Sequence, residues 1–205
     1  MIGKEINAIV FDFGGVLINL NYQATIDAFK KLGITDFEKM YSQAQQSNLF
    51  NDIETGKISS QRFINGLLDY LPKNTTPNKV VEAWNAMILD VPEANLQLLR
   101  DLSKNYRIFL LSNTNALHIS LAFRNWNKVS ESPIEAYFEK IYLSHEIGMR
   151  KPNQDIFDYV CLQSKLDPEK TLFIDDSEQH IIGATSLGIK TIHHKSNTLI
   201  HTHFS

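Results

Sequence analysis

Three aspartates stand directly after apolar runs of strand length. Asp12 follows residues 8–11, and Asp175 and Asp176 follow residues 171–174. Carboxylates that meet at the ends of neighbouring strands repel one another and lose hydration, so they are best tolerated around a cation. A hard divalent ion with oxygen ligands, such as Mg²⁺, suits such a group. The three side chains therefore predict a magnesium site.

Two further segments carry side chains that can bind an anion. Ser112 and Asn113 follow the apolar run 108–111 and offer neutral hydrogen-bond donors, while Lys151 comes after the run 140–143 and offers a cation. A carboxylate nucleophile, a divalent ion, a lysine and a hydroxyl and amide pair are the parts needed for phosphoryl transfer through an aspartyl-phosphate. These residue types indicate an enzyme that transfers phosphoryl groups.

The apolar runs also predict the elements that position these side chains. The four runs and a short fifth at 189–192 alternate with helical patterns. Continuous apolar strands that alternate with helices are typical of an α/β fold with a parallel sheet covered on both faces. In such a sheet functional groups gather where the carboxyl ends of the strands meet loops. The polar residues after the first four runs should therefore meet in one crevice.

Residues 20–92 have a different pattern. Helical segments are expected at 22–32, 36–49, 59–71 and 78–88, with no convincing strand. This pattern predicts a helical cap at 20–92, inserted after the first strand of a core that comprises 1–19 and 93–205. A helix at 93–104 is expected to lead back into that core.

Composition bounds the remaining classes of function. The 205 residues are 43% hydrophobic, enough for one well-buried α/β core, and the net charge of −3 suggests neither a nucleic-acid nor a membrane partner. No apolar stretch approaches the ~20 residues that span a bilayer, and the N-terminus is expected to be a strand rather than a signal peptide. A lone cysteine, Cys161, fits a reducing compartment, so we expect a cytoplasmic protein, monomeric or homodimeric. The late histidines at 193, 194, 201 and 203 are expected to be solvated.

Four segments carry a family resemblance. Residues 11–16, 111–115, 148–152 and 173–177 resemble, in this order, motifs I to IV of the haloacid dehalogenase (HAD) superfamily. Within it the chain is similar to bacterial α-D-glucose-1-phosphate phosphatases and to the N-terminal phosphatase domain of soluble epoxide hydrolases. The resemblance implies a Rossmann-like core with a helical cap and a Mg²⁺-dependent phosphatase acting on a small phosphorylated metabolite.

The resemblance also implies roles for single residues. Asp12 attacks the phosphorus and binds Mg²⁺, as does the backbone carbonyl of Gly14. Asp176 binds the ion directly, and Asp175 acts through a water. The expected phosphoryl-binding and charge-stabilising residues are Ser112, Asn113 and Lys151.

Gly14 departs from the superfamily pattern, because most of its phosphatases carry a general acid there. One explanation is that the substrate is a sugar 1-phosphate. Its leaving group is less basic than an ordinary alkoxide and therefore needs less acid assistance. There are two alternatives. The protein is a 2-haloacid dehalogenase, which needs no acid, or it is a catalytically weak HAD-fold binding protein. His118 and Asn115 are conceivable substitutes for the acid. Cap residues should select the leaving group; Phe50 and Glu54 are candidates, and Arg150 could contact substrate or form a salt bridge.

Overall fold

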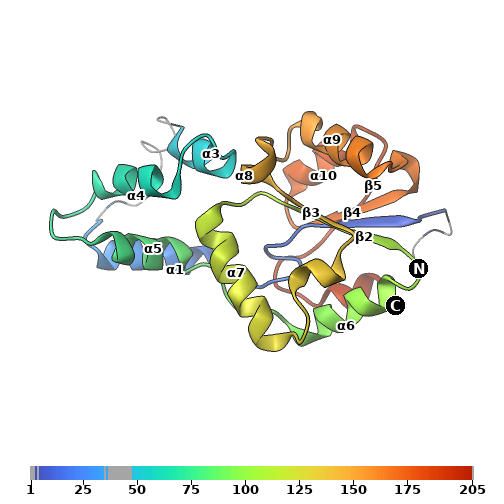
Figure 1. The fold of residues 1–205 in the computed structure, drawn as a ribbon, viewed down its shortest axis with the longest axis horizontal. Helices are drawn as coiled ribbons and strands as arrows, with labels where there is room; N and C mark the ends of the chain where they lie inside the picture. The colour runs from blue at the N-terminus through green and yellow to red at the C-terminus, as the bar shows by residue number, and fades with distance from the viewer. Residues whose placement is uncertain (1–2, 4, 35, 37–47, 205) are drawn as a thin grey trace.

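A five-stranded parallel sheet forms the centre of the computed structural model, which describes residues 3, 5–34, 36 and 48–204 (Figure 1). The strand order is β3-β2-β1-β4-β5. The strands are β1 (Ala8–Phe11), β2 (Arg107–Ser112), β3 (Lys140–Leu143), β4 (Thr171–Asp175) and β5 (Lys190–His193). The chain thus leaves β1 toward one side and returns to its other side through β4, which confirms the predicted α/β sheet. Such a reversal of strand order creates a crevice at the carboxyl edge.

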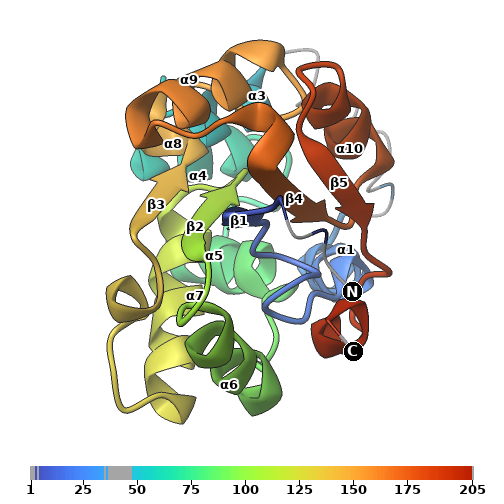
Figure 2. The same cartoon turned by 90° about the vertical axis from the view of Figure 1, so that its right-hand side faces the viewer.

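Both faces of the sheet are buried because the strand residues are apolar at consecutive positions. Ile9 and Phe11 of β1 pack into one hydrophobic cluster, and Ala8 and Val10 into another. The first cluster is covered by α6 (Glu93–Leu102), α7 (Ala116–Val129) and the short turns η1 (Ile134–Tyr137) and η3 (Ile200–His203). The second is covered by α9 (Gln154–Ser164) and α10 (Glu178–Thr185), and the short turn η2 (Pro168–Lys170) leads into β4. Figure 2 shows the two helical layers on opposite sides of the strands.

The helical insertion forms a lobe beside the sheet (Figure 1). Its helices are α1 (Tyr22–Lys31), α3 (Leu49–Glu54), α4 (Ser60–Leu68) and α5 (Pro77–Asn85). A separate apolar cluster that includes Phe29, Phe63 and Trp84 holds them together. The expected helix 36–49 lies largely outside the described residues. α3 continues to Glu54, so the expected end of that helix at 49 was wrong.

Backbone contacts join the lobe to the core at more than one place. The segments near Asn19 and Leu89 run antiparallel: Leu89 N donates to Asn19 O at 3.0 Å, and Asn19 N donates to Asp90 O at 3.0 Å. A second contact lies between α3 and α8 (Ser144–Ile147). There Gly56 has φ +67°, and any Cβ on it would overlap the carbonyl oxygen of His145. Glycine is needed because the two backbones approach so closely. The boundaries of the cap, 20 and 92, stay a prediction.

Part of the C-terminal segment is buried, which the sequence did not suggest. His194 is buried, and its Nδ1 lies 2.9 Å from Nε2 of His203. Ile200 in η3 is fully buried against the core. The expectation that all the late histidines are solvated was therefore wrong, because this segment folds back onto the sheet layers. Among the described residues, no helix is long and apolar enough to cross a membrane.

Candidate active site

Strand register brings the aspartates together. Phe11 lies opposite Leu110 of β2 and Ile174 of β4 in the parallel ladder. The next residues along the chain, Asp12 and Asp175, therefore emerge side by side at the carboxyl edge. Asp12 N donates to Ile174 O at 2.8 Å, which continues the ladder by one bond and fixes the backbone from which the Asp12 side chain extends.

Lys151 lies between these two carboxylates and is completely buried. Its Nζ is 2.8 Å from Asp12 Oδ1 and 2.6 Å from Asp175 Oδ2, and it donates to Leu111 O at 2.9 Å. An ammonium has three hydrogens, so these contacts use all its donors. Burial alone would lower the pKa of Lys151, but the two carboxylates outweigh it and raise that pKa above the ordinary value. The lysine is therefore charged and rigidly held.

The pKa of Asp12 is raised to about 7. Burial is the largest cause, and repulsion from Asp175 adds to it, while Lys151 acts in the opposite direction. Asp175 is affected in the opposite sense. Burial would raise its pKa, but Lys151 and His180 together hold that pKa below the ordinary value. Negative charge is thus disfavoured at Asp12, and a bound cation would offset that penalty.

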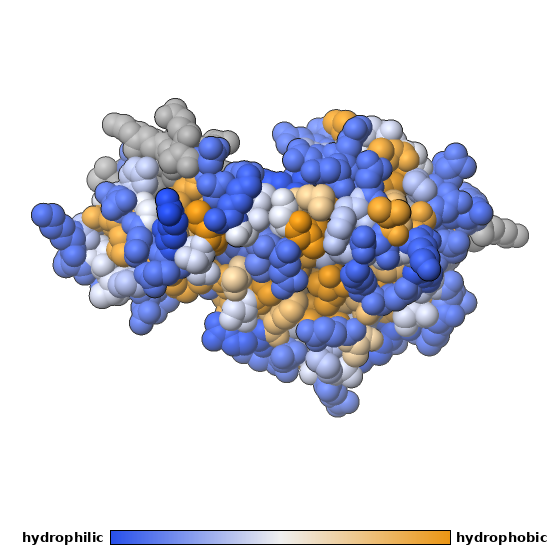
Figure 3. Space-filling model, turned by 45° about the horizontal axis from the view of Figure 1, so that its top comes forward, coloured by the Kyte–Doolittle hydropathy of each residue, from blue (hydrophilic) through white to orange (hydrophobic). Residues whose placement is uncertain are grey.

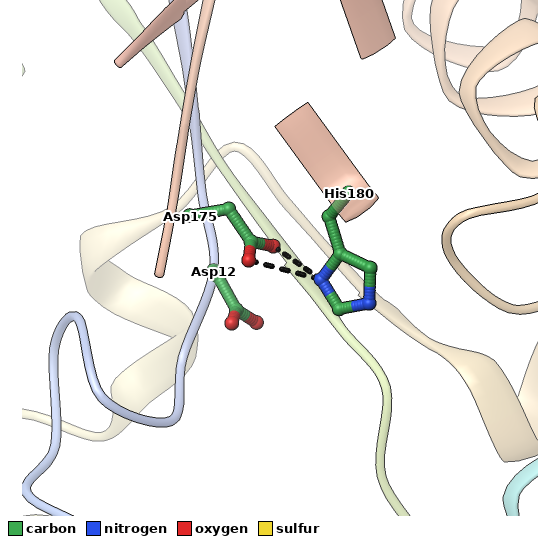
Figure 4. A group of neighbouring side chains, drawn as sticks. All are labelled: Asp12, Asp175 and His180. Atoms are coloured by element: carbon green, nitrogen blue, oxygen red, sulfur yellow. Dashed lines mark hydrogen bonds and ion pairs between the residues drawn. The ribbon is translucent and has the colours of Figure 1, made fainter. Parts of the chain in front are cut away.

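His180, in the first turn of α10, was missed by the sequence analysis. Figure 4 shows its ring against the Asp175 carboxylate, with Asp12 beside them. Nδ1 lies 2.9 Å from Oδ1 and 3.0 Å from Oδ2 of Asp175, and the ligand atoms of all three residues lie within 4.8 Å of one another. Because a carboxylate only accepts, Nδ1 carries the hydrogen. A histidine one turn into the helix after motif IV was the signal that could have pointed to this contact.

The motif II and motif III loops are tied together by side chains. Asn113 Oδ1 accepts from Lys151 N at 2.9 Å, and Asn113 Nδ2 donates to Lys151 O at 2.8 Å. Ser144 Oγ accepts from Thr114 N at 2.9 Å and donates to Thr114 O at 3.1 Å. Asn113 therefore positions the lysine backbone, a role the sequence did not indicate. Its expected contact with phosphoryl oxygens, like that of Ser112, stays a prediction.

Gly14, Gly15 and Asp176 shape the other side of the site. A Cβ on Gly14 would lie 2.6 Å from Cδ1 of Leu20, so this leucine fills the space next to the missing acid. A Cβ on Gly15, where φ is +76°, would overlap Asp176 Oδ2. Burial raises the pKa of Asp176, and the charge of Asp175 adds to the rise. Asp176 faces the same cavity but lies outside the close group that Asp12 forms with Asp175 and His180.

A cavity of about 610 Å³ opens over Asp12, between the core and the helical lobe. Figure 3 shows the two lobes and the notch between them. Of the seven predicted site residues, all except Lys151 and Asp175 line the cavity; those two are buried beside Asp12. An apolar wall is formed by Ile18, Leu20, Ile26, Met87, Ile88 and Ile119. The polar residues of the lining include Tyr22, Glu54 and Arg150.

His118 lines this cavity but is a poor substitute for the missing acid. Its Nε2 lies 3.1 Å from the Trp84 carbonyl oxygen, which requires a hydrogen on Nε2, and its Nδ1 lies 3.2 Å from Asn115 Nδ2. Both ring nitrogens and the Asn115 amide are thus engaged. Burial lowers the pKa of His118 to about 4, so the ring is neutral near pH 7. Its ring stacks on Trp84, with centroids 4.7 Å apart, and links α7 to α5.

The donor set fits a hard divalent cation. Asp12, Asp175 and Asp176 contribute carboxylates around one end of the cavity. Repulsion among them contributes to the raised pKa of Asp12, and oxygen ligands are those that Mg²⁺ prefers. Chemically, the arrangement offers a buried carboxylate beside a fixed ammonium, facing a cavity with room for a small ester.

Comparisons with known proteins agree with this geometry. A family model described as a haloacid dehalogenase-like hydrolase matches residues 6–188. D-ribitol-5-phosphate phosphatase of Bacteroides thetaiotaomicron is 34% identical over 186 residues, 91% of this chain and 90% of the relative. This relative is neither a glucose-1-phosphate phosphatase nor an epoxide hydrolase, so the finer resemblance to those two groups is not shown.

Solved structures give the same result. A HAD family enzyme from B. thetaiotaomicron, in complex with magnesium and inorganic phosphate, superimposes with a TM-score of 0.91 at 36% identity, covering 98% of this chain and 100% of that one. A HAD-like hydrolase from Porphyromonas gingivalis gives 0.84 at 35% identity, covering 95% and 93%. The motif order, the sheet topology, the lysine-bridged aspartates and these matches together show that the chain belongs to the haloacid dehalogenase-like hydrolase family.

Proposed function

We propose that this protein is a magnesium-dependent phosphatase that hydrolyses a small phosphorylated metabolite through an aspartyl-phosphate on Asp12. The observation that carries the proposal is the Asp12 carboxylate at the base of a cavity, 2.8 Å from a buried lysine ammonium. The magnesium and phosphate complex of the B. thetaiotaomicron enzyme supports the same chemistry. The 2-haloacid dehalogenase and the binding protein have no such support.

The reaction proceeds in two steps. An Asp12 carboxylate oxygen forms a bond to phosphorus while the ester P–O bond breaks, and the leaving oxygen takes its proton from solvent water as it departs into the cavity. A water then cleaves the acyl phosphate, which regenerates Asp12 and releases inorganic phosphate. Lys151 offsets the charge of the nucleophile throughout, since it is held by two carboxylates and a carbonyl. Ser112 and Asn113 hold phosphoryl oxygens.

Four groups would bind the magnesium ion: Asp12, the carbonyl of Gly14, Asp176 directly and Asp175 through a water. The ion supplies positive charge against the phosphoryl oxygens when bound. Asp175 is the weaker candidate for direct ligation, because Ser177 N, His180 and Lys151 already occupy both of its oxygens.

For the substrate we propose a linear polyol phosphate such as ribitol 5-phosphate. The similarity to a ribitol-5-phosphate phosphatase supports this class, whereas it gives the expected sugar 1-phosphate no support. A polyol phosphate releases a primary alkoxide, which is more basic than the oxyanion of a sugar 1-phosphate. Leaving-group basicity therefore does not explain Gly14 if the polyol is the substrate.

The test is phosphate release from purified protein with ribitol 5-phosphate, α-glucose 1-phosphate and p-nitrophenyl phosphate, with Mg²⁺ or with EDTA. We expect magnesium-dependent release that is fastest for ribitol 5-phosphate and is abolished by Asp12→Asn. Faster turnover of glucose 1-phosphate would restore the sugar 1-phosphate hypothesis. Chloride release from 2-chloropropionate without metal would overturn the phosphatase assignment itself.

A further inference from the structure

Beyond the reacting groups, the cavity contains one ion pair that the chemistry of phosphoryl transfer does not use. Glu54 is the last residue of α3 in the helical lobe, and its Oε2 lies 2.9 Å from Arg150 Nη2. Arg150 belongs to the motif III loop of the core. Both residues line the cavity, and their side chains are only 24% and 32% exposed. The pair therefore stands between the two lobes, facing the space that a leaving group would occupy.

Each residue of this pair has a polar atom without a hydrogen-bond partner among the described residues. These atoms are Glu54 Oε2 and Arg150 Nε, and both are buried. The 2.9 Å contact between Oε2 and Arg150 Nη2 is an ion pair. Buried polar atoms of native proteins are normally satisfied by protein, water or ligand. A carboxylate acceptor beside a guanidinium donor matches a hydroxyl-bearing chain, since a hydroxyl group can both donate and accept.

The backbone places Glu54 firmly. Thr55 Oγ1 donates to Asn51 O at 2.7 Å, which closes the end of α3. The next residue, Gly56, packs its backbone against His145 in α8 so closely that a side chain would not fit. Burial raises the pKa of Glu54, and Arg150 opposes that rise. The guanidinium thus helps to keep the carboxyl ionised while α3 holds it against the core.

The rest of the cavity explains why this pair matters. One wall is formed by aliphatic side chains that include Leu20, Met87 and Ile119, which can cover carbon atoms but cannot bind hydroxyls. Thr25 also lines the cavity, but its Oγ1 already donates to the Trp84 carbonyl and accepts from Met87 N. The ion pair therefore offers polar atoms where this part of the lining does not.

We propose that Glu54 and Arg150 form a leaving-group subsite that binds the hydroxyl groups of a polyol phosphate and selects it over an unsubstituted alkyl phosphate. This inference rests on the proposed phosphatase function. Glu54 accepts from hydroxyls, and Arg150 both donates to them and holds the Glu54 carboxylate in place. The aliphatic wall covers the carbon chain.

The experiment compares ribitol 5-phosphate with n-pentyl phosphate, which has the same chain length and no hydroxyls, and with p-nitrophenyl phosphate. Glu54→Gln keeps the shape and removes the charge. We expect kcat/KM for ribitol 5-phosphate to fall about 10- to 100-fold, the usual effect of losing hydrogen bonds to a charged group. The values for the other two esters should stay within about threefold. Arg150→Gln should show the same selective loss. Asp52→Asn, on the same helix but outside the cavity lining, is the matched control.

The outcomes separate the two proposals. If the wild type hydrolyses the esters but treats ribitol and pentyl phosphate alike, or if Glu54→Gln slows all three equally, the subsite is refuted and the phosphatase function stands. If the wild type releases phosphate from none of the three, the phosphatase function fails, and this inference fails with it. Thermal unfolding of each variant shows whether a uniform loss reflects a damaged fold.

Discussion

Replacing Lys151 by methionine tests how the catalytic carboxylates are held. The change keeps an unbranched side chain of similar length but removes the ammonium that contacts Asp12 at 2.8 Å and Asp175 at 2.6 Å. Removing one partner of a buried ion pair typically costs about 3–5 kcal/mol, because the other charge stays buried and unpaired. We expect the free energy of unfolding, measured with urea at pH 7 without metal, to fall by about this amount. Phosphatase activity should be lost.

The pH dependence and a second substitution sharpen this test. In the wild type, Lys151 holds the pKa of Asp175 below its usual range, and that stabilisation is present above the unfolded pKa and lost as the pH falls. The deficit of Lys151→Met should therefore shrink in acid, where the orphaned carboxyl groups take up protons. Adding Asp175→Asn removes one orphaned charge and should recover part of the loss, with a coupling of about 0.5–3 kcal/mol.

Lys170→Met, at an exposed lysine, is the matched control and should change stability by no more than about 0.5 kcal/mol. The reasoning is refuted if Lys151→Met loses less than about 1 kcal/mol, since a buried lysine between two carboxylates would then contribute little. It is also refuted if the losses of the Lys151 and Asp175 variants simply add.

Three further predictions concern the same cavity. Because burial lowers the pKa of His118 to about 4, the folded state binds fewer protons than the unfolded state between that pH and about 6.5. The free energy of unfolding should therefore fall as the pH drops through this window. Between pH 7 and pH 5 it should fall by about 2 kcal/mol more for the wild type than for His118→Gln, and parallel urea-unfolding profiles of the two proteins would contradict this. Mg²⁺ at about 100 times the wild-type dissociation constant should raise the unfolding free energy of the wild type by about 2.7 kcal/mol. The same concentration should raise that of Asp176→Asn less, and equal rises in the two proteins would exclude Asp176 as a ligand. A series of aryl phosphates should show a steep dependence of kcat/KM on leaving-group pKa, because Gly14 supplies no acid; a flat series would mean that another group protonates the leaving oxygen.

The sequence alone was sufficient to predict the α/β sheet and several of the residues that meet at its carboxyl edge. Continuous apolar runs such as 108–111 are set by local periodicity, so the strands and their parallel arrangement could be predicted. Because residues that follow parallel strands share one edge, Asp12, Asp175 and Lys151 could be expected to meet. In the structure, Lys151 contacts both aspartates directly.

Only the tertiary structure decided which side chains complete the site. His180 reaches Asp175 because of how α10 packs, and Glu54 meets Arg150, far along the chain, because α3 docks on α8. Leu20 fills the space at Gly14 because the chain folds back there after β1. Periodicity fixes which face of an element is buried, but a contact between distant segments depends on how the elements pack together. That packing turns a row of motifs into a cavity with a polar edge and an apolar wall.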